Sequence, residues 1–227
     1  MWRLLPFVLI LGYALVMWLF SAWRMKQMLD RHARPLTHPR LVPMLHHLGA
    51  AMDLPPIRAH VCEVAPINGL AAPDGRIFLT RGFLDALDAG RVTEAELASV
   101  IAHELGHVAH GHTRRRMIDF AGQNLLRSVM AGVLGRFIPV IGGWVAHLLD
   151  SAVAARMSRG DEYQADAFAS ALMVRAGLGT GPQKSLLAKL GHLTGPAGGT
   201  PAWLMSHPAT DRRIAAIEAL ERKWGLT

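Results

Sequence analysis

One short motif restricts the fold of this 227-residue chain more than any other feature: His103-Glu104-Leu105-Gly106-His107. On a helix, residues four positions apart differ by about 40° in azimuth, so both imidazoles project from the same side. Two ring nitrogens at that spacing can bind one Zn²⁺ ion, and Glu104 can then reach a water molecule on the metal. The motif therefore predicts a helix that carries a site for metal-assisted hydrolysis.

A helical histidine pair can also be a surface accident or a satisfied feature of a core, so the flanking sequence matters. The segment 93–96 (TEAE) has the form of a capping box and predicts a helix that begins there and runs to about Arg116. Its expected buried face consists of apolar residues at spacings of three and four: Leu97, Ile101, Leu105 and Val108. The motif thus lies in the middle of an amphipathic helix, which favours metal binding.

Glu162 and Asp166 form a second candidate pair, on a helix expected over residues 161–176 and ended by Gly177. A catalytic zinc usually has three protein ligands, and one of these carboxylates could be the third. Asp166 could then accept a hydrogen bond from the far nitrogen of a ligating histidine. The spacing fits equally well with a solvated acidic face that the helix dipole favours. Spacing alone leaves both interpretations open.

The composition predicts a globular domain with a hydrophobic core, because 51% of the residues are hydrophobic and 18% are charged. Strong strand signals occur only within residues 58–80, at 59–64 and 77–80, and a helical pattern follows. We therefore expect an α+β fold, mainly α, with a small β-sheet. The single cysteine, Cys62, excludes an internal disulfide framework. The net charge of +7 comes from dispersed basic residues without a recognition motif, so nucleic acid is not an expected partner.

Residues 4–23 contain no charged side chain and are long enough to cross a bilayer as a helix. A cleaved signal peptide is less well supported, because no small-residue cleavage site follows. We expect an N-terminal transmembrane anchor at 1–23, a juxtamembrane helix and linker at 24–56, and a catalytic domain at 57–227. Basic residues are in excess after the span, which predicts a single-pass protein of the cell (inner) membrane with its domain on the cytoplasmic side.

Four motifs in order along the chain resemble the HtpX-type membrane zinc metalloproteases, the gluzincin group that includes the CAAX prenyl protease. They are HELGH at 103–107, EYQAD at 162–166, SHP at 206–208 with RRI at 212–214, and NGLAAPDGRIFLTRG at 68–82. The resemblance covers roughly residues 58–220 and implies a zincin-like metalloprotease domain with one Zn²⁺ per chain. The full HtpX form has further membrane spans, so the resemblance leaves the membrane topology open.

The resemblance also implies a role for each matching residue. The zinc ligands would be His103, His107 and Glu162. Glu104 would be the general base, and Asp166 would be the outer carboxylate that orients a ligand. His207 would stabilise the oxyanion. An edge strand that pairs with the substrate backbone would consist of Asn68, Gly69, Leu70, Ala71 and Ala72.

A second apolar stretch at residues 129–149 cannot be a single membrane crossing if His107 before it and Glu162 after it bind one ion. Two crossings would need about 40 apolar residues, and charged residues interrupt this interval. We expect helices that cover the site or dip into the membrane interface; an ordinary core helix pair broken near Pro139 is an equal alternative.

These features together predict a membrane-anchored zinc metalloendopeptidase, with polypeptides as substrates and residues 4–23 in the lipid bilayer. The resemblance implies a task in the quality control of membrane or misfolded proteins. Two alternatives stay open: a non-catalytic zinc-binding chaperone or adaptor, and a prenyl-peptide processing protease. Assembly into a homo-oligomer is compatible with the sequence.

Overall fold

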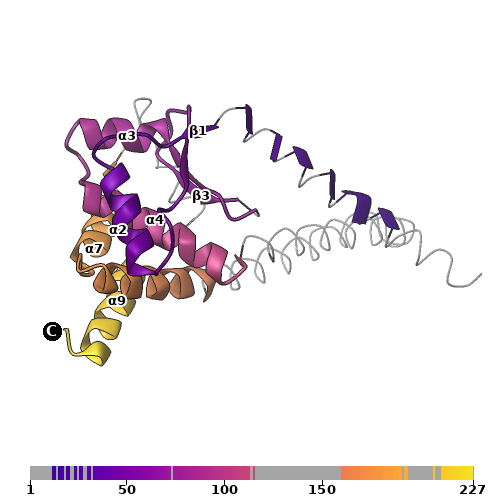
Figure 1. Cartoon of the computed structure of the whole chain (residues 1–227). Coiled ribbons are helices and arrows are strands. Elements are labelled where there is room, and N and C mark those ends of the chain that lie inside the picture. The colour runs from indigo at the N-terminus through magenta and orange to yellow at the C-terminus, as the bar shows by residue number, and fades with distance from the viewer. Residues whose placement is uncertain are drawn as a thin grey trace, which may run out of the picture.

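The computed structural model describes residues 33–72, 74–112, 115, 160–190, 192–193, 207 and 211–226, together with part of the segment 12–31 (Figure 1). The stretch 129–149 lies outside the described residues. So do residues 1–11 of the expected membrane anchor. Among the described residues, no helix is both long and apolar enough to cross a membrane.

A small mixed sheet of four strands forms one side of the described chain. The strands are β1 (Ala33–Pro35), β2 (Ala59–Cys62), β3 (Gly69–Ala71) and β4 (Ile77–Thr80), in the spatial order β1-β2-β4-β3. β2 and β4 are parallel, whereas β1 and β3 pair antiparallel with their neighbours. Both strands that the composition of residues 58–80 predicted are present, although β2 ends two residues early.

Helices make up most of the remaining described residues. They are α2 (Val42–Ala51), α3 (Arg81–Asp88), α4 (Glu94–Ala109), the helix of residues 160–175, α7 (Gly181–Leu190) and α9 (Asp211–Trp224). The prediction of a mainly helical fold with a small sheet is confirmed for the described part of the chain. β1 and α2 lie within the segment 24–56.

Helix α4 is the central element, and it begins as predicted. The Thr93 hydroxyl accepts from the Glu96 backbone N–H, and the Glu96 carboxylate accepts from the Thr93 N–H, which completes the capping box. The expected end near Arg116 is wrong, because α4 stops at Ala109. Gly111 has a φ of +66°, a left-handed conformation that ends a helix and that glycine adopts at little cost.

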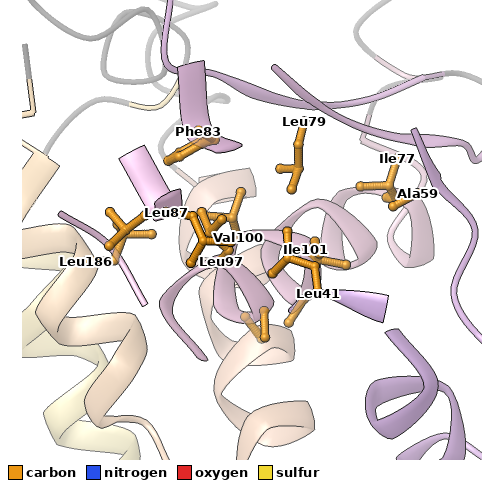
Figure 2. Packing of buried hydrophobic residues seen from close by; sticks show 14 of the residues in the cluster. Leu41, Ala59, Ile77, Leu79, Phe83, Leu87, Leu97, Val100, Ile101 and Leu186 are labelled. Carbon is orange, nitrogen blue, oxygen red and sulfur yellow. The ribbon is translucent and has the colours of Figure 1, made fainter. Parts of the chain in front are cut away.

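The hydrophobic core lies between the sheet and the helices, with α4 running through it (Figure 2). Leu97 and Ile101 of α4 are fully buried, as the periodicity predicted. They pack in one cluster with side chains from the sheet, from α3, from the chain before α2 and from α7, including Leu79, Phe83, Leu41 and Leu186. This packing holds α4 in place from several sides, so the residues on its remaining face have fixed positions.

The helix of residues 160–175 crosses α4 at a glycine. A Cβ atom added to Gly106 would lie 2.8 Å from the Ala165 Cα and 2.9 Å from its carbonyl oxygen. Only glycine permits this approach, since such distances are below the normal van der Waals contact. Gly106 lies inside the HELGH motif, and Ala165 lies inside EYQAD. The close crossing therefore brings the two motifs together.

The described part of residues 12–31 is helical and leads away from the other elements (Figure 1). Its side chains include exposed apolar groups, among them Tyr13, Leu19 and Trp23. Near its end, Asp30 accepts a hydrogen bond of 2.6 Å from Arg76, which also binds Asp74 at 2.8 Å. The segment thus contacts the turn between β3 and β4.

We expect Gly106→Ala to lower the free energy of unfolding of the metal-free protein by about 1–3 kcal/mol, because the new methyl group forces α4 and the helix of residues 160–175 apart. Metal affinity should fall as well. Gly181→Ala is the matched control, since a Cβ at Gly181 in α7 meets no atom within 4 Å. Urea unfolding and metal titration of both variants check this prediction; equal behaviour of the two would contradict it.

Candidate metal centre

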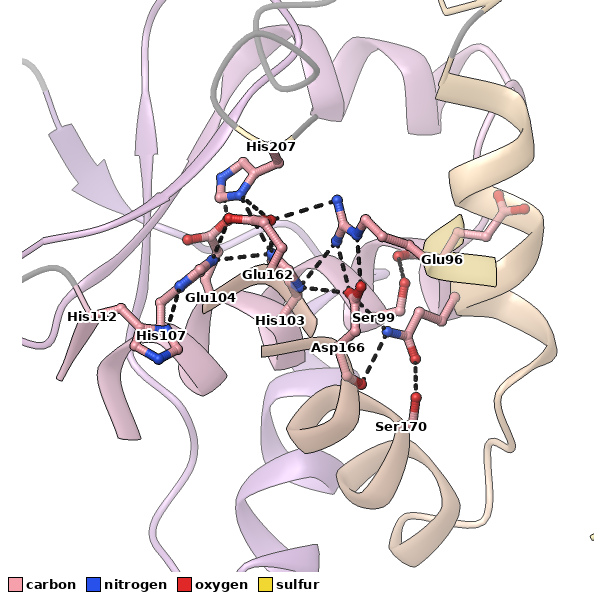
Figure 3. Close-up of polar contacts among 12 residues, drawn as sticks. Glu96, Ser99, His103, Glu104, His107, His112, Glu162, Asp166, Ser170 and His207 are labelled. Carbon is pink, nitrogen blue, oxygen red and sulfur yellow. Dashed lines mark hydrogen bonds and ion pairs between the residues drawn. The ribbon is translucent and has the colours of Figure 1, made fainter. Parts of the chain in front are cut away.

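Four buried side chains from three separate segments converge beside α4 (Figure 3). His103 and His107 come from α4, Glu162 comes from the helix of residues 160–175, and His207 follows much later in the chain. Their candidate ligand atoms all lie within 4.8 Å of one another. The spacing of Glu162 left open whether it faces a metal site or belongs to a solvated acidic face. Its side chain is buried against the histidines, which excludes a solvated face.

The distances within this group fit a metal ion bound by three donors. The Nε2 atoms of His103 and His107 are 3.2 Å apart, and they lie 3.3 and 3.4 Å from the two carboxylate oxygens of Glu162. Tetrahedral bonds of about 2.0–2.1 Å place neighbouring donor atoms roughly 3.3–3.4 Å apart. The side chains are therefore spaced as ligands of one ion would be.

Asp166 orients His103 through a hydrogen bond to the ring nitrogen that faces away from the other donors. Its Oδ1 accepts from the His103 Nδ1–H at 3.0 Å, which leaves Nε2 facing the other donors. Arg213 of α9 donates two hydrogen bonds to Asp166, of 2.6 and 2.7 Å, and Gln183 of α7 donates a third at 3.3 Å. A metal-ligating histidine usually makes such a bond, which sets its tautomer and orientation.

The charges buried around the group are unbalanced without a cation. Glu104, Glu162 and Asp166 are nearly inaccessible to solvent, and in the described part of the chain Arg213 is the buried cation that faces them. Neutral imidazoles would leave this cluster with two negative charges. Buried charges need compensation, so the cluster favours a divalent ion.

The pKa values reflect the same charges. Burial alone would lower the pKa of His103, but its hydrogen bonds to Asp166 and Glu162 outweigh burial and raise the pKa to about 9. Burial lowers the pKa of His107, and the bond to Glu162 does not restore it. Burial would raise the pKa of Glu162, yet its three histidine partners hold it well below the usual range. In the metal-free protein His103 therefore carries a proton that a metal ion would replace.

Glu104 and His207 face each other next to the ligand group. Glu104 is 1% exposed, and its Oε1 lies 3.5 Å from the His207 Nε2. Among the described residues this buried oxygen has no hydrogen-bond partner. The His207 Nδ1 lies 2.8 Å from the Glu162 Oε2, so His207 is in direct contact with the ligand group. A residue that only stabilises an oxyanion does not need this contact. Sequence analysis assigned His207 to the oxyanion and did not place it among the possible ligands.

Strand β3 is an edge of the sheet and runs beside Glu104. A Cβ at Gly69 would lie 3.5 Å from the Glu104 Oε1. Asn68 accepts a hydrogen bond from the Thr80 N–H, and the Ala72 N–H donates to Arg76.

In an antiparallel ladder, hydrogen-bonded and non-bonded pairs alternate, so the N–H and C=O groups of Gly69 and Ala71 point away from β4. No described strand pairs with that edge. The five residues at 68–72 thus contain the edge strand, with Asn68 and Ala72 just outside its bounds.

Sequence reasoning missed three residues of this site. Arg213 and Gln183 support Asp166 as described above, and His112 lies 2.9 Å from His107. Arg213 was present in the RRI motif without a role, and the glycine before His112 was the available signal that α4 ends early. His110, also in the histidine-rich segment, is exposed.

The sequence profile described as peptidase family M48 matches residues 35–221 of this chain. The chain belongs to this family. The predicted resemblance to HtpX-type metalloproteases is therefore confirmed. Membership of M48, a family of metallopeptidases, agrees with a centre whose four donor residues could bind a metal ion.

Relatives with names of the same kind match at modest identity. "Protease HtpX homolog" of Acidiphilium cryptum is 34% identical over 161 residues, which cover 62% of this chain and 53% of that protein. "Metalloprotease LoiP" of Escherichia coli is 26% identical over 178 residues, or 78% of this chain and 68% of the relative. "Beta-barrel assembly-enhancing protease" of Yersinia pestis is 27% identical over 168 residues, or 70% and 33%. The matched region thus spans about half the length of the HtpX homologue.

We expect the metal-free M48 chain to lose stability as the pH rises from about 6.5 to 9. His103 has a folded-state pKa of about 9, above the ordinary value of 6.5 that applies after unfolding. The folded state therefore binds more protons in this window, and the free energy of unfolding falls as that proton is lost. Bound metal replaces the proton and removes the loss.

His103→Gln is the control for this pH dependence, because it has no imidazole to protonate. Chemical unfolding at several pH values in the presence of a chelator measures the effect. The same slope in the parent and in His103→Gln would show that another group is responsible.

Proposed function

We propose that this chain is a membrane-anchored zinc metalloendopeptidase that hydrolyses peptide bonds of membrane or misfolded proteins. One observation carries the proposal: two imidazoles and a carboxylate are spaced as ligands of one ion, with the buried Glu104 directly beside them. A binding-only site for a chaperone or adaptor has no use for a base at that position.

One Zn²⁺ per chain, held by His103, His107 and Glu162, is the proposed cofactor. Two nitrogens and one carboxylate are a common donor set of catalytic zinc, and three ligands leave a position for substrate or water. When bound, zinc lowers the pKa of a water molecule towards neutrality and polarises a carbonyl oxygen. Asp166 keeps His103 oriented towards the ion.

Glu104 is the proposed general base and acid. Its Oε1, buried and without a hydrogen-bond partner among the described residues, accepts a proton from the attacking water and then delivers it to the leaving amine. His207 is proposed to stabilise the oxyanion by hydrogen bonding, an effect commonly worth a few kcal/mol, about 2–4 per donor. Its Nε2 lies on the Glu104 side of the group, which supports a position near the reacting carbonyl.

The substrate is proposed to bind as an added strand along β3. The outward main-chain groups of Gly69 and Ala71 can pair with an extended peptide next to Glu104. Main-chain recognition does not read side chains, so cleavage should show little sequence preference. Asn68, Leu70 and Ala72 hold this edge in register with β4.

The proposed anchor is the uncharged segment 4–23 in the lipid bilayer. Exposed apolar side chains in its described part, such as Phe20 and Trp23, support a lipid surrounding. In this proposal residues 1–23 anchor the protein in the inner membrane as a single pass, residues 24–56 connect the anchor through β1 and α2, and residues 57–227 are the peptidase domain on the cytoplasmic side.

Glu104→Gln should abolish cleavage of an unfolded model protein such as casein, because an amide cannot accept the proton. Zinc content should stay at one ion per chain, since Glu104 is not a proposed ligand. Casein cleavage and metal analysis with the parent protein and the variant make the test. Equal cleavage by both would remove Glu104 from the mechanism, whereas a parent that binds zinc without cleaving would favour the chaperone alternative.

Cleavage of a farnesylated peptide, compared with cleavage of the same peptide without the farnesyl group, tests the alternative of a prenyl-peptide processing protease. The proposed main-chain recognition predicts similar rates for both peptides. Strong preference for the farnesylated form would favour the prenyl-peptide protease.

Ala71→Pro should lower kcat/KM towards protein substrates by about tenfold, because it removes one outward N–H that is worth roughly 1–1.5 kcal/mol. The fold should tolerate proline there, since the Ala71 N–H does not bond to β4. Leu70→Pro is the contrasting variant: it removes a hydrogen bond within the sheet and should lower the melting temperature. Unchanged kcat/KM in folded Ala71→Pro would exclude pairing of substrate at this position.

A further inference from the structure

The two histidines of the HELGH motif have different supports behind them. His103 donates to the carboxylate of Asp166. His107 instead faces another imidazole, since its Nδ1 lies 2.9 Å from the Nδ1 of His112. His112 is fully buried, although it follows a segment of exposed residues. A buried polar ring pressed against a candidate ligand calls for an explanation.

The contact depends on the break at the end of α4. In a continuous helix His112, five residues after His107, would point roughly 140° away around the helix axis. The left-handed φ of +66° at Gly111 ends the helix and turns the chain back, so His112 comes to lie over His107. The ring centroids are 5.1 Å apart.

The hydrogen-bond partners determine which nitrogen of each ring carries a proton. The His107 Nε2 faces His103 and Glu162, and a metal ligand must have a bare nitrogen there. The proton of neutral His107 is then on Nδ1, and among the described residues the Nδ1 of His112 is its acceptor at 2.9 Å. His112 in turn carries its proton on Nε2, which donates to the Gln164 Oε1 at 3.0 Å, with the Asp161 carboxylate at 3.5 Å.

We propose that His112 is a positioning residue that fixes the tautomer and orientation of His107 for metal binding. This inference rests on the proposed metal site. His112 accepts the Nδ1–H of His107 and so orients this ligand, as Asp166 orients His103. The acceptor behind His107 is a neutral imidazole, whereas the acceptor behind His103 is a charged carboxylate. Figure 3 shows His107 and His112 side by side. Gln164, between Glu162 and Asp166 in the EYQAD motif, is the outer acceptor that orients His112.

The chemistry of the acceptor suggests a matched pair of variants. In His112→Asn the amide oxygen can take the place of the Nδ1 acceptor, whereas in His112→Gln the amide extends to the position of Nε2. Both side chains are polar and similar in size, so a purely structural role would affect them alike. The test is the dissociation constant for Zn²⁺ by competition with a chromophoric chelator, together with the visible absorption of the Co²⁺-loaded proteins.

We expect His112→Asn to keep the parent's Co²⁺ spectrum and to bind Zn²⁺ within a few-fold of the parent. His112→Gln should bind about 10–100-fold more weakly, the usual effect of losing a partner behind a ligand, with an altered spectrum. His192→Asn, which replaces an exposed histidine beyond α7, should match the parent in both measurements.

Equal Zn²⁺ affinities and equal spectra of His112→Asn and His112→Gln would overturn the proposal, whether both resemble the parent or both are weakened alike. Gln164→Leu tests the outer bond at an exposed position where folding is not at risk, and it should weaken Zn²⁺ binding by a few-fold. Unchanged binding in Gln164→Leu would remove Gln164 from the arrangement. A parent protein that binds no Zn²⁺ would instead contradict the proposed function itself.

Discussion

The contact between Gly106 and Ala165 is the constraint on which the site depends. It allows the backbones of α4 and the helix of residues 160–175 to approach more closely than any side chain would permit. Each helix contributes a pair of polar residues four positions apart, and the crossing lies between the members of both pairs. The histidines of one helix thereby meet the carboxylates of the other. Gly106 within the HELGH motif is in this sense as necessary to the geometry as the proposed ligands.

Burying three carboxylates next to three imidazoles requires strong compensation, and Arg213 supplies part of it. Its two bonds to Asp166 hold the pKa of that carboxyl well below its usual range, although burial acts in the opposite direction. Arg213 also lies 3.6 Å from Glu162, so one guanidinium contacts both Glu162 and Asp166. Helix α9, which is distant in sequence, is thereby tied to the centre through charge as well as through packing.

Local patterns predicted the elements that local interactions determine. The capping box at Thr93 and the apolar spacing of α4 are properties of neighbouring residues. The capping box is present as expected, and of the predicted face Leu97 and Ile101 are fully buried, whereas Leu105 and Val108 are partly buried. The proximity of Glu162 could not be derived from spacing, because it depends on a crossing between segments more than fifty residues apart. Only the resemblance to HtpX-type proteases assigned Glu162 as a zinc ligand, because its motif matches the motif of that family. The end of α4 was wrongly predicted, because we expected the helix to continue through Gly111, whose left-handed φ of +66° ends it.

The edge of β3 that no described strand covers, which is the proposed substrate site, has a consequence for which proteins the chain could cleave. Outward main-chain groups on alternate residues repeat about every 6.6–6.8 Å, and only a locally extended partner can match them. In a folded protein most such segments are already paired within their own structure. The rate of cleavage would then follow how often a segment of the target opens spontaneously, so a difference of about 1.4 kcal/mol in local unfolding would change it tenfold. The choice of substrate would therefore depend on the conformational stability of the target more than on the residues around the cleaved bond.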